Sequence, residues 1–306
     1  MDKIALVFPG QGSQTVGMGR ELGEASPRWD VANGALGFDL RRLCFGGPEA
    51  DLTLTANTQP AILTTSMVAL DALVAAGIHF DFVAGHSLGE YSALVAAGAL
   101  DFADAVRTVR ARGQFMQEAV PAGQGAMAAI LGLDRGLVAQ ICEEAQDAGV
   151  VQVANLNGPG QTVIAGAAAG VRRAVELAKI RGAKRAVPLP VSAPFHSALM
   201  APAASRLGLV LQGLRIRDLR VPLVTNVDAD LLTDGARVVD VLVRQVTAPV
   251  RWEEGITRLV KEGAGTFVEV GPGKVLSGLI RRIAPEARVL NVEGRASLDT
   301  TMETLR

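Results

Sequence analysis

Short apolar runs alternate with longer amphipathic stretches along most of the chain. Lys3–Phe8 (KIALVF), Phe82–Gly85 (FVAG) and Thr266–Val270 (TFVEV) are bounded by proline, glycine or polar residues, which is typical of buried strands. Apolar positions at helical spacing occupy Thr58–Ala76 and the stretch from Asp101 to about Val120. This alternation of strands and helices predicts an α/β domain.

The middle of the chain, after the break at Pro121–Gly125 (PAGQG), has a different pattern. It predicts strands at Ala126–Leu133, Val150–Asn155, Gln161–Gly166 and Lys184–Val191, and helices at Arg135–Ala148 and Ala168–Arg181. The order β-α-β-β-α-β is the split βαβ pattern of ferredoxin-like domains. Because the first pattern resumes afterwards, we expect an inserted subdomain over residues 124–197. Residues 1–123 and 198–306 then form one discontinuous large domain.

The segments on either side complete the large domain. Helical material with irregular stretches is expected from Met18 to Leu54, and a proline-containing linker at Ser192–Ser197. The later pattern predicts helices at Leu199–Leu214, Gly235–Gln245 and Trp252–Gly263, with strands at Val221–Asn226 and Arg288–Val292.

The strand at Phe82–Gly85 leads into the motif G-x-S-x-G, formed here by Gly85-His86-Ser87-Leu88-Gly89. In a nucleophile elbow of this kind, a sharp strand-to-helix turn exposes the serine oxygen, and glycines leave room for the turn. The bare motif is a weak signal, but the predicted strand before it and helix after it supply the required setting. Ser87 is therefore the candidate nucleophile.

A serine hydroxyl needs a base near neutral pH, and the chain has only three histidines. His86 precedes Ser87 on the elbow and should point away from the hydroxyl, whereas His79 lies in a polar turn. His196, in a proline-flanked loop, is the base by elimination. No acidic residue stands out to orient it, so an amide side chain or a backbone carbonyl is the expected support. The amides of Leu88 and of Gln11, in the glycine-rich loop after the first strand, are the expected oxyanion donors.

Arg112 lies beside the apolar stripe of the helix that begins near Asp101. An arginine at such a position either extends to solvent or meets an anion. From its position alone, a salt bridge on the helix surface is the favoured interpretation.

Composition narrows the classes of function. Of 306 residues, 20% are charged, the net charge is −1 and 4% are aromatic, which argues against nucleic acid or an anionic membrane as partner. The apolar run at the N-terminus is too short for a signal peptide, and polar residues interrupt the most apolar helix, Pro60–Ala76. Cys44 and Cys142 lack metal-ligand spacing. We expect a cytoplasmic protein with no metal site.

Seven segments in chain order resemble malonyl-CoA:acyl carrier protein transacylases. They are FPGQGSQ, GHSLGEY, RGQFMQEA, NGPGQTVIAG, PFHS, VRQ and VGPGKVLSGL. The resemblance implies an α/β-hydrolase-like large domain with an inserted ferredoxin-like subdomain. It also implies malonyl-CoA as substrate, acyl carrier protein as partner, no tightly bound cofactor and a monomeric state.

The resemblance also assigns roles to individual residues. Ser87 resembles the acyl-accepting serine, and His196 its base. Arg112 matches the arginine that holds the malonyl carboxylate, which replaces the salt-bridge interpretation. The remaining matches are Gln11 and Leu88 as oxyanion amides, Gln245 as support for the histidine, and Asn155 and Asn157 near the pantetheine entrance.

Phe195 departs from the pattern of many family members, which have serine before the histidine (PSHC). Here the sequence is Phe195-His196-Ser197. The resemblance implies that a phenylalanine at this position selects malonyl groups, because its bulk crowds an α-methyl substituent. Methylmalonyl is therefore the less favoured substrate.

Three alternatives stay open at this point. A serine hydrolase such as an esterase would use the same nucleophile and base, with water resolving the acyl-enzyme. A related acyltransferase of polyketide synthesis or malonate decarboxylation would differ only in its carrier. A non-catalytic module that docks acyl carriers would have no need of Ser87, His196 and Arg112 together.

Overall fold

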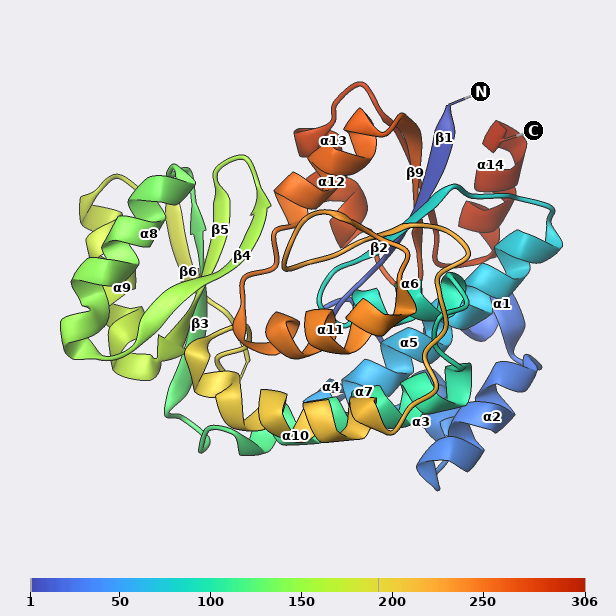
Figure 1. Ribbon diagram of the computed structural model, residues 1–306, viewed down its shortest axis with the longest axis horizontal. Helices are drawn as coiled ribbons and strands as arrows, with labels where there is room; N and C mark the ends of the chain where they lie inside the picture. The colour runs from blue at the N-terminus through green and yellow to red at the C-terminus, as the bar shows by residue number, and fades with distance from the viewer. Residues whose placement is uncertain (1, 192, 306) are drawn as a thin grey trace.

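Two β-sheets of different construction organise the chain, which a computed structural model describes over residues 2–191 and 193–305 (Figure 1). The larger sheet contains β1 (Lys3–Phe8), β2 (Phe82–Gly85), β7 (Leu223–Val224), β8 (Leu231–Leu232), β9 (Ala264–Val270) and β10 (Arg288–Val292). Its order is β10-β9-β1-β2-β7-β8, and neighbouring strands are parallel except β7 and β8. The sheet has the α/β architecture that the sequence predicts.

Helices cover both faces of this sheet because its strands alternate between two apolar cores. On β1, Leu6 and Phe8 join the larger core, whereas Ala5 and Val7 join the smaller one. The larger core is built with α5 (Thr55–Ala75), α6 (Gly89–Ala96), α7 (Phe102–Glu118), α10 (Ala201–Gln212), α11 (Val238–Thr247) and α14 (Arg295–Leu305). The smaller is built with α12 (Trp252–Lys261) and α13 (Val275–Ile283).

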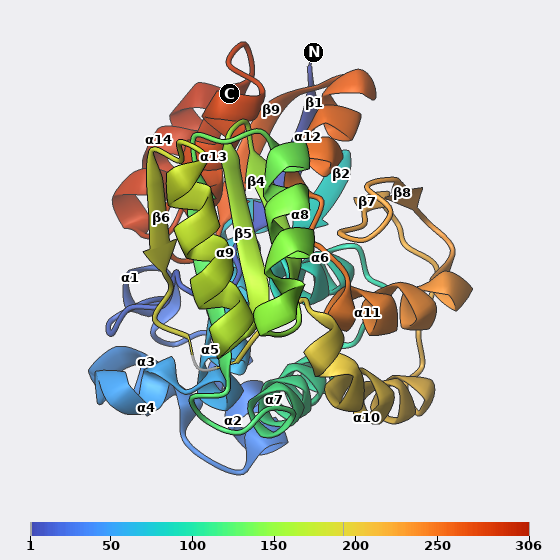
Figure 2. The ribbon, with the colours of Figure 1, turned by 90° about the vertical axis from the view of Figure 1, so that its left-hand side faces the viewer.

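The second sheet is antiparallel and belongs to the middle of the chain. Its elements are β3 (Gly125–Leu131), α8 (Arg135–Glu144), η1 (Ala145–Ala148), β4 (Val151–Gly158), β5 (Gln161–Ala167), α9 (Ala168–Ile180) and β6 (Arg185–Pro188). The strand order β4-β5-β3-β6 is that of a ferredoxin-like unit, as predicted. Figure 2 shows α8 and α9 side by side over one face of this sheet. The limits proposed for the subdomain, residues 124 and 197, stay a prediction.

Several boundaries differ from those predicted. The segment from Met18 to Leu54 forms four short helices, α1 (Arg20–Gly23), α2 (Pro27–Leu36), α3 (Leu40–Gly46) and α4 (Glu49–Thr53). Two further 3-10 turns are η2 (Ala198–Met200) and η3 (Gly235–Arg237), and the sequence did not predict β8 or α14. Helix α5 begins at Thr55 because Gln117 of α7 accepts a hydrogen bond from the Ala56 amide, a contact made only in the folded chain. The predicted linker includes residue 192, which lies outside the described residues.

Helix α5 is the one helix in the described ranges that is long and apolar enough, by length and composition, to cross a membrane. In the fold, 78% of its most apolar window is buried. It packs against α7 and carries much of the larger core. The structure therefore uses α5 as a core helix.

Candidate active site

The turn between β2 and α6 places Ser87 at the carboxyl end of the parallel strands. Ser87 adopts a φ of 52°, in the left-handed region that non-glycine residues rarely occupy. A Cβ on Gly85 would lie 1.9 Å from the carbonyl carbon of Gly89, and one on Gly89 would lie 2.0 Å from the Phe8 carbonyl oxygen. Both positions therefore require glycine, and the motif forms the strained elbow that the sequence predicts.

His196 meets Ser87 from the loop that follows the small sheet. Its Nε2 lies 2.7 Å from Ser87 Oγ, and its Nδ1 lies 2.8 Å from the Gln245 carbonyl oxygen. A carbonyl oxygen only accepts, so Nδ1 carries the proton and the Nε2 lone pair faces the serine hydroxyl. The support for the histidine is thus a backbone carbonyl, which is one of the two supports that the sequence left open.

The ionisation of His196 suits a base. Burial, together with the positive charge of Arg112, lowers the pKa of His196 from 6.5 to about 3. The imidazole is therefore neutral at physiological pH and can accept the serine proton.

Arg112 is not on the surface, so the salt bridge favoured by its position alone is wrong. Its side chain is only 2% exposed. Nη1 donates to Gln59 Oε1 at 2.9 Å, and Nη2 donates to Gln245 Oε1 at 2.9 Å and to Ser87 Oγ at 3.1 Å. Periodicity placed Arg112 at the edge of the stripe, but side chains of α5, α6 and α11 cover that edge in the fold. The arrangement is a guanidinium held by neutral oxygens and aimed at the nucleophile.

The residues of two backbone amides, Leu88 and Gln11, line the cavity beside Ser87. Leu88 caps the N-terminus of α6, and Gln11 lies in the turn after β1. Phe8 is paired with Gly85 in the parallel register of β1 and β2, which brings the β1 loop beside the elbow. Within the part of the chain that the structure describes, neither amide donates a hydrogen bond to protein. Both are suited to stabilise an oxyanion that develops beside Ser87.

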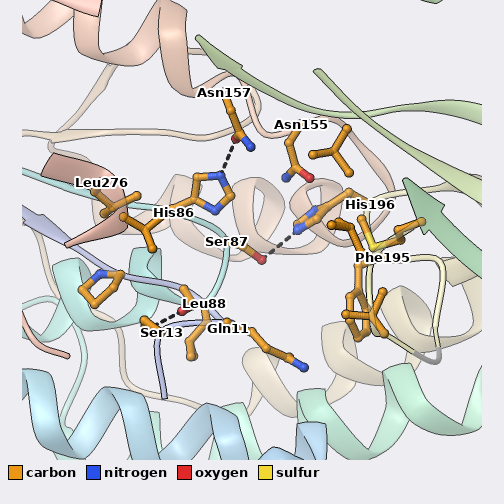
Figure 3. A pocket seen from close by; sticks show the side chains of 18 of the residues that line it. Gln11, Ser13, His86, Ser87, Leu88, Asn155, Asn157, Phe195, His196 and Leu276 are labelled. Atoms are coloured by element: carbon orange, nitrogen blue, oxygen red, sulfur yellow. Dashed lines mark hydrogen bonds between the residues drawn. The ribbon is translucent and has the colours of Figure 1, made fainter. Parts of the chain in front are cut away.

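These groups line one cavity of about 240 Å³ between the two sheets. Figure 3 shows Ser87 directed toward His196, while the His86 ring faces Asn157. His86 Nε2 lies 2.8 Å from Asn157 Oδ1, so His86 points away from the serine hydroxyl as predicted. Asn155 and the half-buried Phe195 line the same cavity. Of the residues singled out for the site, Gln245 lies behind the cavity wall, bonded to His196 and Arg112, and the others line the cavity. His79 is exposed elsewhere, as expected.

Comparisons with known proteins agree with this geometry. The family described as acyl transferase domain matches residues 5–300. A malonyl CoA-acyl carrier protein transacylase of Bacillus subtilis (strain 168) is 53% identical over 311 residues, covering 100% of this chain and 98% of the relative.

The chain belongs to the malonyl CoA-acyl carrier protein transacylase family.

Solved structures of this family share the whole fold. An acyl-carrier-protein S-malonyltransferase from Burkholderia pseudomallei 1710b superposes with a TM-score of 0.96 at 48% identity, covering 98% of this chain and 99% of that one. A second structure holds a type II PKS acyl-carrier protein in complex with its malonyl-transacylase. That match has a TM-score of 0.96 at 44% identity and covers 99% of both chains. The α/β fold with its antiparallel four-stranded subdomain is therefore that of the malonyl CoA-acyl carrier protein transacylases.

Sequence reasoning missed two residues that hold the elbow of this transacylase fold. Asn226 accepts a hydrogen bond from the Ser87 amide at 2.7 Å and donates to the Gly85 carbonyl oxygen at 2.7 Å. The backbone amide of Asn226 donates to Glu90 Oε1 instead of to a neighbouring strand, and the predicted strand Val221–Asn226 is observed only as Leu223–Val224. Glu90 is fully buried in the first turn of α6, and burial raises its pKa to about 7. The sequence offered one indication of this role, because Glu90 is a charged residue at the start of the apolar segment that follows the G-x-S-x-G motif.

In the ranges 2–191 and 193–305, no group of three or more His, Cys, Asp or Glu side chains could hold a metal ion. Cys44 and Cys142 are buried in separate helices, α3 and α8.

Proposed function

We propose that the chain transfers a malonyl group from malonyl-CoA to acyl carrier protein for fatty acid synthesis by way of an acyl-enzyme on Ser87. The observation that carries this proposal is the position of Ser87 Oγ, 2.7 Å from a base and 3.1 Å from a buried guanidinium. The base can activate the serine hydroxyl as a nucleophile, and the guanidinium can bind the carboxylate of a malonyl group.

In the first step, Ser87 Oγ attacks the thioester carbonyl carbon while His196 Nε2 takes the hydroxyl proton. The Gln245 carbonyl stabilises the imidazolium through Nδ1–H. The oxyanion lies against the amides of Leu88 and Gln11, each of which contributes about 3–4 kcal/mol in comparable sites. When the intermediate collapses, the C–S bond breaks and the CoA thiol leaves with the proton from His196.

In the second step, the thiol of the phosphopantetheine arm of acyl carrier protein replaces CoA. His196 takes the thiol proton, the sulfur attacks the ester carbonyl, and Ser87 leaves with that proton. The same base and the same amides therefore serve both halves of a ping-pong reaction.

Arg112 selects the acyl group in this proposal. A planar guanidinium can bind a carboxylate with two parallel hydrogen bonds, which a lysine cannot do. The malonyl carboxylate accepts the hydrogen bond that Nη2 donates to Ser87 Oγ in the free protein. Phe195 crowds an α-methyl group at the same cavity, and Asn155 and Asn157 face the path of the pantetheine arm. A monomeric state and a cytoplasmic location stay predictions.

Mass spectrometry of the intact protein tests the proposed function. After incubation with malonyl-CoA we expect a mass gain of one malonyl group on Ser87 that persists in water. Addition of acyl carrier protein bearing its phosphopantetheine arm should remove it and yield malonyl-carrier. Release of mostly free malonate would instead indicate a serine hydrolase, and the absence of any adduct would indicate a docking module without catalysis.

The protonation of His196 gives a second prediction. Because burial and Arg112 lower its pKa, the ring should stay neutral from about pH 8 down to about pH 5, where an exposed histidine becomes charged. Arg112→Ala removes the positive charge, so the pKa of His196 should rise. Nuclear magnetic resonance of labelled histidine rings measures this directly, with His196→Gln assigning the signal. A midpoint near 6.5 for His196 in the unmodified protein would contradict the prediction.

A further inference from the structure

Glu90 is a buried carboxylate that the proposed mechanism does not use. It lies in the first turn of α6, beneath the elbow, with no exposed surface. Oε1 accepts a hydrogen bond from the Asn226 amide at 3.1 Å, and Oε2 accepts one from Gln245 Nε2 at 2.5 Å. Such a group costs free energy to bury unless its partners compensate. One of these partners, Gln245, also accepts a hydrogen bond from Arg112, the residue whose guanidinium contacts Ser87 Oγ.

The hydrogen bonds of the Gln245 side chain determine which way its amide is turned. Its two N–H groups point to Glu90 Oε2 and to the Ser87 carbonyl oxygen, the latter at 2.9 Å. Its oxygen is thereby left to accept the hydrogen bond from Arg112 Nη2. The Ser87 carbonyl oxygen has no donor, and neither has the Glu90 carboxylate when it is ionised, so the group that faces them is the NH₂ end of the amide. A flipped amide would set its oxygen against two acceptors and its NH₂ against the guanidinium.

Arg112 depends on this orientation. Only two side-chain oxygens besides Ser87 Oγ accept its hydrogen bonds in the described residues, Gln59 Oε1 and Gln245 Oε1. The negative charge of Glu90 also favours the charged form of Arg112, since it opposes the effect of burial on the arginine pKa. Glu90 therefore acts on Arg112 both through the amide and through its charge, without touching it.

We propose that Glu90 is a positioning residue that orients the Arg112 guanidinium through the Gln245 side chain and so sets the preference for acyl groups carrying a carboxylate. This inference rests on the proposed function, because the preference has meaning only if Arg112 binds the substrate carboxylate. A merely structural Glu90 would hold the loop after β7 to α6 and would affect all acyl groups equally.

The test is Glu90→Gln, which keeps the size of the side chain but replaces one acceptor oxygen with a donor. Glutamine cannot accept from Gln245 Nε2 and from the Asn226 amide through two different oxygens, so one contact sets donor against donor. We expect kcat/KM for malonyl transfer to fall roughly ten- to a hundredfold. Acetyl transfer, which has no carboxylate for Arg112, should change by less than about threefold.

A double-mutant cycle separates a role through Arg112 from a direct one. In an Arg112→Ala background, Glu90→Gln should cause no further loss of malonyl transfer. Glu269→Gln is the matched control, because Glu269 is also a fully buried glutamate whose carboxylate accepts two amide N–H groups, from Leu276 and Ser277. Its ratio of malonyl to acetyl transfer should equal that of the unmodified protein.

Equal losses of malonyl and acetyl transfer in Glu90→Gln, or additive losses in the double variant, would overturn the inference. If Glu90→Gln does not fold, as judged by circular dichroism, Glu90→Asp takes its place. It keeps the charge but is one methylene too short to hold the amide, and it should lose malonyl transfer more than acetyl transfer. The unmodified protein is labelled with malonyl-CoA in parallel. No adduct there would refute the proposed function, whereas an adduct with unchanged selectivity in the variants would refute only the role of Glu90.

Discussion

Ser87→Ala is expected to abolish acylation by malonyl-CoA, with a loss of about 10⁴-fold or more in transfer to the carrier. No other hydroxyl in the described residues lies at the lone pair of His196 Nε2. The backbone needs no new strain, because alanine and serine meet the same penalty at a φ of 52°. The hydroxyl faces a cavity, so its removal should leave the thermal unfolding temperature nearly unchanged. Intact-protein mass spectrometry with labelled malonyl-CoA measures the loss.

Ser92→Ala is the matched control for this variant. Ser92 is a fully buried serine in α6, the helix that follows the elbow, and its hydroxyl has no hydrogen-bond partner in the described residues. It should therefore be labelled like the unmodified protein. Full labelling of Ser87→Ala would remove the central claim, since the acyl group would then sit on another residue.

Most of the fold could be predicted from the sequence because its elements are locally determined. The strands Lys3–Phe8 and Phe82–Gly85 were predicted with the bounds observed, since each is an apolar run closed by proline or by the elbow. The start of α7 was predicted from Asp101, whose side chain caps the helix by accepting from two amides. The start of α5 at Thr55, the two-residue extent of β7 and the strand β8 were not predicted. They depend on contacts between segments that are distant in sequence, and hydrophobic periodicity carries no information on such contacts.

The candidate site also contains features that local sequence predicts and features that depend on contacts between distant segments. The elbow could be predicted because its glycines, serine and helix are adjacent in sequence. Arg112 was misplaced by its position alone, because burial at the edge of a helical stripe depends on what other elements cover it. The partners of Gln245 could not be predicted at all. They come from α6, α7 and the elbow, and only the fold brings Glu90, Arg112 and the Ser87 carbonyl around one amide.

Arg112→Ala is expected to lower kcat/KM for malonyl transfer roughly a hundredfold or more, while acetyl transfer changes by less than about tenfold. The malonyl carboxylate would then enter a cavity whose nearest groups are the oxygens of Gln59 and Gln245, with no positive charge to offset its desolvation. An acetyl group carries no such charge, so its transfer loses only what the contact between Arg112 and Ser87 Oγ contributes. Competition between malonyl-CoA and acetyl-CoA for the same protein measures the change in selectivity.

Two further variants distinguish charge from geometry at this position. Arg112→Lys keeps the positive charge but has a single nitrogen, so it should retain part of the malonyl preference and lose the part that needs two parallel hydrogen bonds. Arg110→Ala is the control on the same helix, because Arg110 bonds to Asn57 and lies over the Phe38 ring instead of lining the cavity. Its selectivity should be unchanged. Equal losses of malonyl and acetyl transfer in Arg112→Ala would mean that the arginine only supports the pocket, and the choice of acyl group would then have to come from Phe195 and the cavity walls.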